Sequence, residues 1–193
     1  MTVLIWEVMK VNGFFTTAFI FAIGCSVGWL IEVLFRRFVS FDNPERRWVN
    51  PGFLKGPWLP LYGFGLLVLF TLCNADALIK APILLFAAIG VSMTALEYIA
   101  GLVSTRLLKV RLWDYSRERG NLDGLICPKF SIIWAVCGIL YYYFLHPILQ
   151  HATNAVVFSA GLKFFVVKYM ICFFWDLALS LKKHMKVGYL TKR

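Results

Sequence analysis

The sequence has few charged residues, and this shortage argues against a soluble domain. Asp, Glu, Lys and Arg make up only 16% of the 193 residues, whereas a soluble domain carries about 25%. Apolar residues make up 60% and aromatic residues 17%, which is typical of a chain that faces lipid and is anchored at the membrane interface. We therefore predict an all-α integral membrane protein in which residues 1–193 form a single transmembrane domain.

The sequence also lacks the short motifs of common nucleotide-dependent and hydrolytic enzymes. It contains no P-loop, no HExxH, no GxSxG and no DDxxD pattern. Its five cysteines form no CxxC pair, and no histidine lies at metal-ligand spacing. We expect no cofactor and no metal site, and an enzymatic role is the less favoured interpretation. Any ATP that powers the protein would be bound by another chain.

Five apolar segments are long enough to cross about 30 Å of hydrocarbon. A backbone in lipid must satisfy its own hydrogen bonds, so these segments are predicted to be transmembrane helices. They cover residues 14–35, 59–78, 82–107, 130–149 and 156–181.

The net charge of +10 is distributed very unevenly along the chain. Of the 20 lysines and arginines, 16 lie in the loop after the first segment, the loop after the third, and the C-terminal tail. Positive charge collects on the cytoplasmic side of membrane proteins. We therefore predict a multi-pass cell-membrane protein with the N-terminus outside and the C-terminus cytoplasmic. The basic loops would attract anionic lipids, and no nucleic-acid partner is expected.

The two halves of the chain share an order of residues that would fit a parallel repeat of two helical hairpins plus a fifth helix. In each half a glutamate in an apolar segment is followed by Trp, Asn, Gly and Pro before the next segment begins. The members are Glu32, Trp48, Asn50, Gly52 and Pro57 in the first half, and Glu97, Trp113, Asn121, Gly124 and Pro128 in the second.

Two glutamates lie inside predicted transmembrane segments. An intramembrane carboxylate costs a few kcal/mol unless it is paired, hydrated or protonated, so Glu32 and Glu97 are candidate functional residues. Arg36 lies four residues after Glu32 and could pair with it on the same helical face, so a plain interfacial ion pair is the alternative interpretation. Glu97 has no basic residue at the corresponding positions, and its partner must come from elsewhere in the chain.

A segment rich in Gly and Pro, residues 50–65, follows the first basic loop. Such a backbone cannot continue a regular helix, and at membrane depth it is tolerated only when buried in protein or lining a cavity. We predict that it packs into the helix bundle, while an ordinary loop before a proline-started helix is the alternative. The candidate substrate-binding residues, including a second cluster at residues 113–121, are Glu32, Arg36, Asn50, Trp58, Tyr62, Glu97, Trp113, Asp114, Tyr115 and Asn121.

Several of these blocks together resemble a known bacterial family. The blocks are Gly28-Trp-Leu-Ile-Glu32, Asn50 to Gly63, Glu97-Tyr98, and Trp113-Asp-Tyr-Ser116 with Asn121. They are similar to the CmpB-like family of type IV ABC-transporter permeases of the bacterial inner membrane, over about residues 20–135. The resemblance implies a role in transport.

Three functions are compatible with these features. The favoured one is a permease-like or membrane substrate-binding component, with an ATP-binding-cassette ATPase subunit or a second copy of the chain as partner. The second is a membrane-embedded enzyme acting on a lipid or isoprenoid substrate, in which Arg36 and Arg37 would hold phosphate. The third is a non-catalytic membrane scaffold.

Overall fold

The computed structural model describes residues 2–40, 43–75 and 79–190, with side chains described for residues 11–40, 43–75 and 79–183. Within this part of the chain the regular elements are helices, and the only β pairing is one isolated bridge between Leu122 and Ile126. The predicted all-α class is confirmed. The elements are α1 (Thr2–Phe38), α2 (Pro60–Cys73), α4 (Pro82–Leu102), η1 (Val103–Leu107), α5 (Pro128–Leu140), η2 (Tyr141–Leu145), α6 (His146–Phe158) and α7 (Ala160–Leu190).

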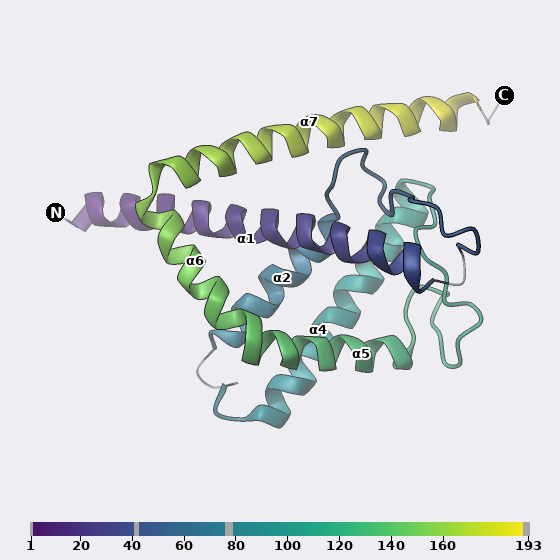
Figure 1. The fold of residues 1–193 in the computed structure, drawn as a ribbon, viewed down its shortest axis with the longest axis horizontal. Coiled ribbons are helices and arrows are strands. Elements are labelled where there is room, and N and C mark those ends of the chain that lie inside the picture. Colours follow the sequence, from purple (N-terminus) through teal and green to yellow (C-terminus); the bar gives the residue numbers. More distant parts are fainter. Residues whose placement is uncertain (1, 41–42, 76–78, 191–193) are drawn as a thin grey trace.

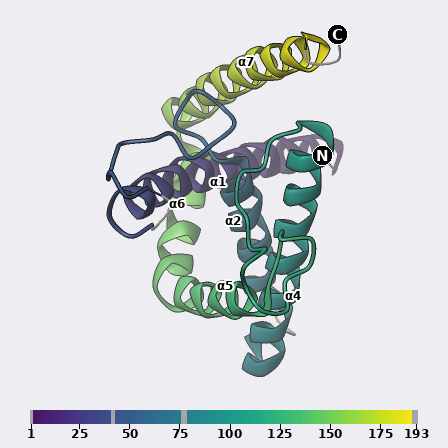
Figure 2. The same ribbon diagram turned by 90° about the vertical axis from the view of Figure 1, so that its right-hand side faces the viewer.

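The helices alternate in direction. In Figure 1, α1, α4 and α7 run from left to right, whereas α2 and α5 run the opposite way. Helix α1 packs against α2, α2 against α4, and α4 against α5, while α7 rests on α1. Figure 2 shows α2 and α4 side by side. The loops over residues 43–59 and 108–127 and the C-terminal end of α7 therefore share one half of the molecule (Figure 1).

Among the described residues, four helical stretches are long and apolar enough to cross a membrane. They are Val11–Phe38, Pro82–Leu107, Pro128–Phe158 and Ala160–Lys183. The predicted segment over residues 59–78 is shorter than expected: α2 has 14 residues, or about 21 Å. Its end follows from Asn74, which caps the last turn. Residues 76–78 lie outside the described residues. Five helices thus fit the chain, with α2 the short member.

The fourth predicted segment, residues 130–149, differs more from the structure than the second segment does. This segment was expected to end near residue 149, but the helix continues as α6 through Phe158. The five-residue π-helical turn η2 and Pro147 lie where α5 passes into α6. These two features bend a helix without ending it, so the helix continues. Figure 1 shows the resulting change of direction between α5 and α6.

Prolines determine where several helices begin. Pro60, Pro82 and Pro128 start α2, α4 and α5, because a proline at the first position has no N–H to leave unpaired. The third segment, predicted over residues 82–107, matches α4 and η1 together. The predicted repeat of two hairpins is not established, since α2 ends after 14 residues whereas α5 continues through η2.

Helices α1 and α2 cross at a glycine contact that positions Tyr62. A Cβ at Gly24 would lie 2.7 Å from the Tyr62 carbonyl oxygen, and a Cβ at Gly63 would lie 2.5 Å from Cys25 Sγ. A Cβ at Gly28 would lie 2.2 Å from Tyr62 Cγ. The spacing of Gly24 and Gly28 therefore permits the close helix approach that this motif allows, with the Tyr62 ring lying on Gly28.

The Gly- and Pro-rich segment packs into the helix bundle, as predicted. Pro51 and Leu54 are buried, and the Leu59 N–H donates to the Cys25 carbonyl in the middle of α1 at 3.1 Å. Asp176 of α7 holds the segment from the other side. Its Oδ2 accepts hydrogen bonds from the Gly56 N–H and from Trp58 Nε1, both at 2.8 Å.

We expect Asp176→Ala to loosen this segment. The substitution leaves the Gly56 N–H and Trp58 Nε1 without their acceptor, and two orphaned donors in a buried place cost about 3 kcal/mol together. Thermal unfolding in detergent should show a clearly lower midpoint. Cys172→Ala is the matched control, since Cys172 is exposed on the same helix. Equal unfolding midpoints for the two variants would contradict the role of Asp176 in holding this segment.

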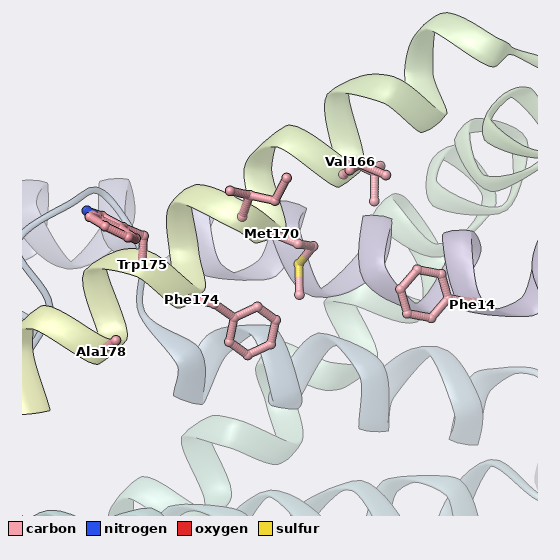
Figure 3. Close-up of a pocket in the computed structure, with 8 residues that line it drawn as sticks. Phe14, Val166, Met170, Phe174, Trp175 and Ala178 are labelled. Carbon is pink, nitrogen blue, oxygen red and sulfur yellow. The ribbon is translucent and has the colours of Figure 1, made fainter.

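Helix α7 touches the bundle along only part of its length and leaves an apolar groove beside α1. Figure 3 shows Met170 and Phe174 of α7 and Phe14 of α1 around this groove, which has a volume of about 480 Å³. Trp175 and Phe174 are exposed. Lipid chains can cover such a surface in a membrane, so the groove is compatible with the transmembrane assignment.

Candidate functional site

The first candidate glutamate is held by two partners. Glu32 Oε1 accepts a hydrogen bond from Arg36 Nε at 3.1 Å, and Glu32 Oε2 accepts one from the Tyr62 hydroxyl at 3.0 Å. The side chains of Glu32 and Arg36 are 23% and 31% exposed. The pair is therefore partly open to solvent, and Tyr62 of α2 fixes the second carboxylate oxygen.

The second candidate glutamate is in a different environment. Glu97 is only 3% exposed, and its Oε1 accepts a hydrogen bond from the Tyr115 hydroxyl at 2.9 Å. Its Oε2 has no hydrogen-bond partner among the described residues. Within the described side chains, no lysine, arginine or histidine forms an ion pair with it. Glu97 is thus a buried carboxyl group with one unsatisfied oxygen and no neutralising cation.

Trp134 of α5 also belongs to the surroundings of Glu97. Its indole nitrogen lies close to the Glu97 carboxyl, but neither Trp134 Nε1 nor Glu97 Oε2 forms a hydrogen bond of acceptable geometry. The ring also packs edge-on against Tyr62, with 5.9 Å between ring centroids. The sequence analysis missed Trp134. The available signal was a tryptophan in the middle of an apolar helix, because a buried indole N–H needs a hydrogen-bond partner.

Tyr62 and Tyr115 connect the two glutamates. The Tyr62 hydroxyl donates to Glu32 and lies within electrostatic range of Glu97. Tyr115, in the loop after η1, is half-buried, and its partial burial raises its pKa; the adjacent Glu97 carboxylate and then Tyr62 raise it further. Both phenols therefore stay protonated and act as hydrogen-bond donors to the carboxylates. Tyr115 also stacks on Phe130 at 4.3 Å.

Arg36 connects these residues to the loop over residues 108–127. Besides Glu32, it donates from Nη2 to the Leu112 carbonyl oxygen at 3.3 Å. The structure thus brings together five of the ten predicted residues in what we call the two-carboxylate cluster: Glu32, Arg36, Tyr62, Glu97 and Tyr115. We define Trp134 as its sixth member. Neither glutamate lines the apolar groove beside α1.

Asn50 and Trp58 lie elsewhere. Asn50 Nδ2 donates to the Leu54 and Lys55 carbonyl oxygens, and its Oδ1 accepts from Trp29 Nε1 of α1 at 3.0 Å. Trp58 is held by Asp176 of α7, as described above. The hydrogen-bonding groups of both side chains are used to fix the Gly- and Pro-rich segment against the helices.

Trp113, Asp114 and Asn121 shape the second loop. Trp113 Nε1 donates to the Leu125 carbonyl oxygen at 2.8 Å. Asp114 accepts from the Ser116 N–H and hydroxyl, and these bonds lower its pKa. Asn121 donates to the carbonyl oxygens of residues 116 and 118 and accepts from the N–H of residue 124. The loop folded by these three residues places Tyr115 against Glu97.

The burial of Glu97 without a paired cation limits the charge state that its carboxyl group can adopt. Transfer of an ionised carboxylate to an apolar environment is prohibitively costly unless a counter-charge accompanies it. An ionised Glu97 would therefore need a counter-charge that none of the described residues supplies, whereas Glu32 is paired with Arg36.

The helices and this cluster define a multi-pass membrane protein with acidic side chains inside the bundle. The sequence matches the family described as "Putative ABC-transporter type IV" over residues 19–181, so the chain belongs to this ABC-transporter-related family. The resemblance noted over residues 20–135 is confirmed and extends to α7. Comparisons with curated proteins and with solved structures gave no match.

Proposed function

We propose that the protein is a permease-like component of a transport system and that the two-carboxylate cluster binds a proton or a small cationic solute. The observation that carries the proposal is the state of Glu97, which is 3% exposed with one carboxylate oxygen unpaired. An intramembrane acid of this kind marks an ion, proton or substrate path.

The charge of the surroundings supports a cationic ligand. Arg36 neutralises Glu32, so Glu97 is the carboxyl group that a cation or an amine would meet. Tyr115 donates to it, Trp134 lies close to it, and Tyr62 packs edge-on against Trp134. Aromatic rings attract cations that approach their faces. A small amine or metal ion therefore suits this environment better than an anion does.

The positions of the loops support a cytoplasmic site. The two basic loops lie in the same half of the molecule as the C-terminal end of α7 (Figure 1), which agrees with a cytoplasmic C-terminus and an N-terminus outside. These loops would contact anionic lipid headgroups and dock the ATPase subunit that an ABC-type transporter requires. Because α2 is short, a second copy of the chain or another membrane subunit would complete the path.

The transport function fits better than the lipid-processing enzyme. That enzyme would use Arg36 and Arg37 to hold a phosphate group. Arg36 is bonded to Glu32 and to the Leu112 carbonyl oxygen, and the Arg37 guanidinium lies over the rings of Phe38 and Trp48. No observation in the described part of the chain favours a reaction at the cluster.

A ligand screen by thermal unfolding tests the proposal. The purified protein would be heated with monovalent ions, divalent ions and small amines, each at several pH values. A ligand at 100 times its Kd stabilises the folded state by about 2.7 kcal/mol. We expect at least one cation or amine to raise the midpoint of the wild-type protein but not that of Glu97→Gln. If every stabilising cation acts equally on both proteins, the proposed site is wrong.

A further inference from the structure

A second polar pocket lies at the end of α4, away from the two-carboxylate cluster. It has a volume of about 370 Å³, within the range of small-ligand sites. Its position is at the end of the membrane-crossing stretch Pro82–Leu107, where the basic loop begins. The residues that line it are Leu102, Thr105, Arg106, Arg111, Asp123 and Leu125.

Local backbone features create this pocket. The π-helical turn η1 carries Arg106 past the end of α4. Asp123 and Gly124 have φ values of 55° and 67°, and the Leu125 N–H donates to the Leu122 carbonyl oxygen at 2.9 Å. Two consecutive positive φ values with an Asp-Gly pair are typical of a type I′ turn. The turn projects Asp123 toward α4, where its Oδ2 accepts from the Tyr98 hydroxyl at 3.0 Å.

The pocket contains two cationic groups and one anionic group. Arg111 donates to the Asp123 carbonyl oxygen at 2.7 Å and pairs with Asp114 at 3.4 Å. A guanidinium has five N–H donors, so Arg111 keeps donors for a ligand. Arg106 forms no hydrogen bond or ion pair with any of the residues described. Its guanidinium is therefore available, and Asp123 supplies the opposite charge across the pocket.

Apolar residues continue from this pocket along the lipid-facing side of α4. Leu102 and Leu125 form its apolar wall, and Ile99, Val103 and Leu107 are exposed nearby on α4 and η1, with Leu107 at 75%. A ligand with a zwitterionic head and apolar chains would match both parts. Its head would lie among the charges and its chains along the helix.

We propose that this pocket binds the headgroup of an aminophospholipid. The phosphate lies between Arg106 and Arg111, the primary ammonium lies on Asp123, and the acyl chains follow α4 past Ile99 and Val103. Charge complementarity distinguishes this ligand from a purely anionic lipid, because Asp123 would repel a second negative group. The pocket is separate from the two-carboxylate cluster, so the inference does not depend on the proposed transport function.

Lipid titration of the purified, delipidated protein tests the inference, with binding followed by native mass spectrometry. The probes are phosphatidylethanolamine, phosphatidylcholine and phosphatidylglycerol of the same acyl composition, and water-soluble phosphoethanolamine. We expect phosphatidylethanolamine to bind most tightly. Arg106→Gln should weaken it about tenfold, since one charge-assisted contact to phosphate is lost. Arg119→Gln, an exposed arginine in the same loop, should bind as the wild type does.

A second substitution tests the ammonium contact. Asp123→Asn keeps an oxygen for Tyr98 but removes the negative charge, so the preference for phosphatidylethanolamine over phosphatidylglycerol should disappear. The inference is overturned if phosphatidylglycerol binds the wild-type protein equally well, or if Arg106→Gln and Arg119→Gln weaken binding alike. Equal affinity for soluble phosphoethanolamine would overturn the assignment of a lipid.

Discussion

Glu97→Gln is expected to remove cation-dependent stabilisation while leaving the fold nearly unchanged. Glutamine keeps an oxygen that can accept from Tyr115, and it fills almost the same volume. It cannot carry the negative charge that attracts a cation. The unfolding midpoint without ligand should therefore stay close to that of the wild type, whereas any rise on addition of the cation found in the screen should vanish.

Glu97→Ala should also damage the fold. It leaves the half-buried Tyr115 hydroxyl without its acceptor and opens a cavity beside Trp134, which together cost about 2–4 kcal/mol. Circular dichroism thermal scans of the two variants separate binding from folding. Glu45→Gln serves as control, because Glu45 is exposed in the first loop. A glutamine variant that still responds to the cation would mean that Glu97 has a structural role only.

Gly28→Ala is expected to be strongly destabilising for so small a change. The added Cβ would lie 2.2 Å from Tyr62 Cγ, so either the ring or the α1–α2 crossing must shift. Overpacking of this kind costs about 1–3 kcal/mol. The displaced Tyr62 would also lose its hydrogen bond to Glu32, so the variant should impair cation binding as well.

Gly13→Ala is the matched control on the same helix. No atom lies within 4 Å of a Cβ built at Gly13, and alanine favours helix over glycine by about 1 kcal/mol. We therefore expect a neutral or slightly higher midpoint. If displacement of Tyr62 causes the Gly28 effect, the costs of Gly28→Ala and Tyr62→Phe should not add in the double variant. Strict additivity would exclude that explanation.

Sequence reasoning predicted the parts of the fold that depend on local signals. Apolar length and starting prolines gave the 82–107 segment correctly, because both are local properties of the chain. They did not reveal that α2 ends at Cys73 or that the helix bends at Tyr141–Leu145 and continues through α6. Hydropathy averages over a window, so it does not register a π-helical turn or a cap.

The candidate site was predictable to a similar degree. The pairing of Glu32 with Arg36 follows from helical spacing and is confirmed. The partner of Glu97 could not be deduced in this way, because Tyr115 reaches it from a loop 18 residues later. Trp134 comes from a separate helix, and only the packing of α4 against α5 brings it to the site.

Chemical labelling of the two glutamates tests the central claim most directly. Hydrophobic carbodiimides react with protonated carboxyl groups inside membranes, and mass spectrometry of the digested protein locates the adduct. The buried Glu97, which forms no ion pair with a described residue, should be labelled in preference to Glu32, which is paired with Arg36. A cation that binds the cluster should protect Glu97. Preferential labelling of Glu32, or labelling of Glu97 that no cation reduces, would contradict the account.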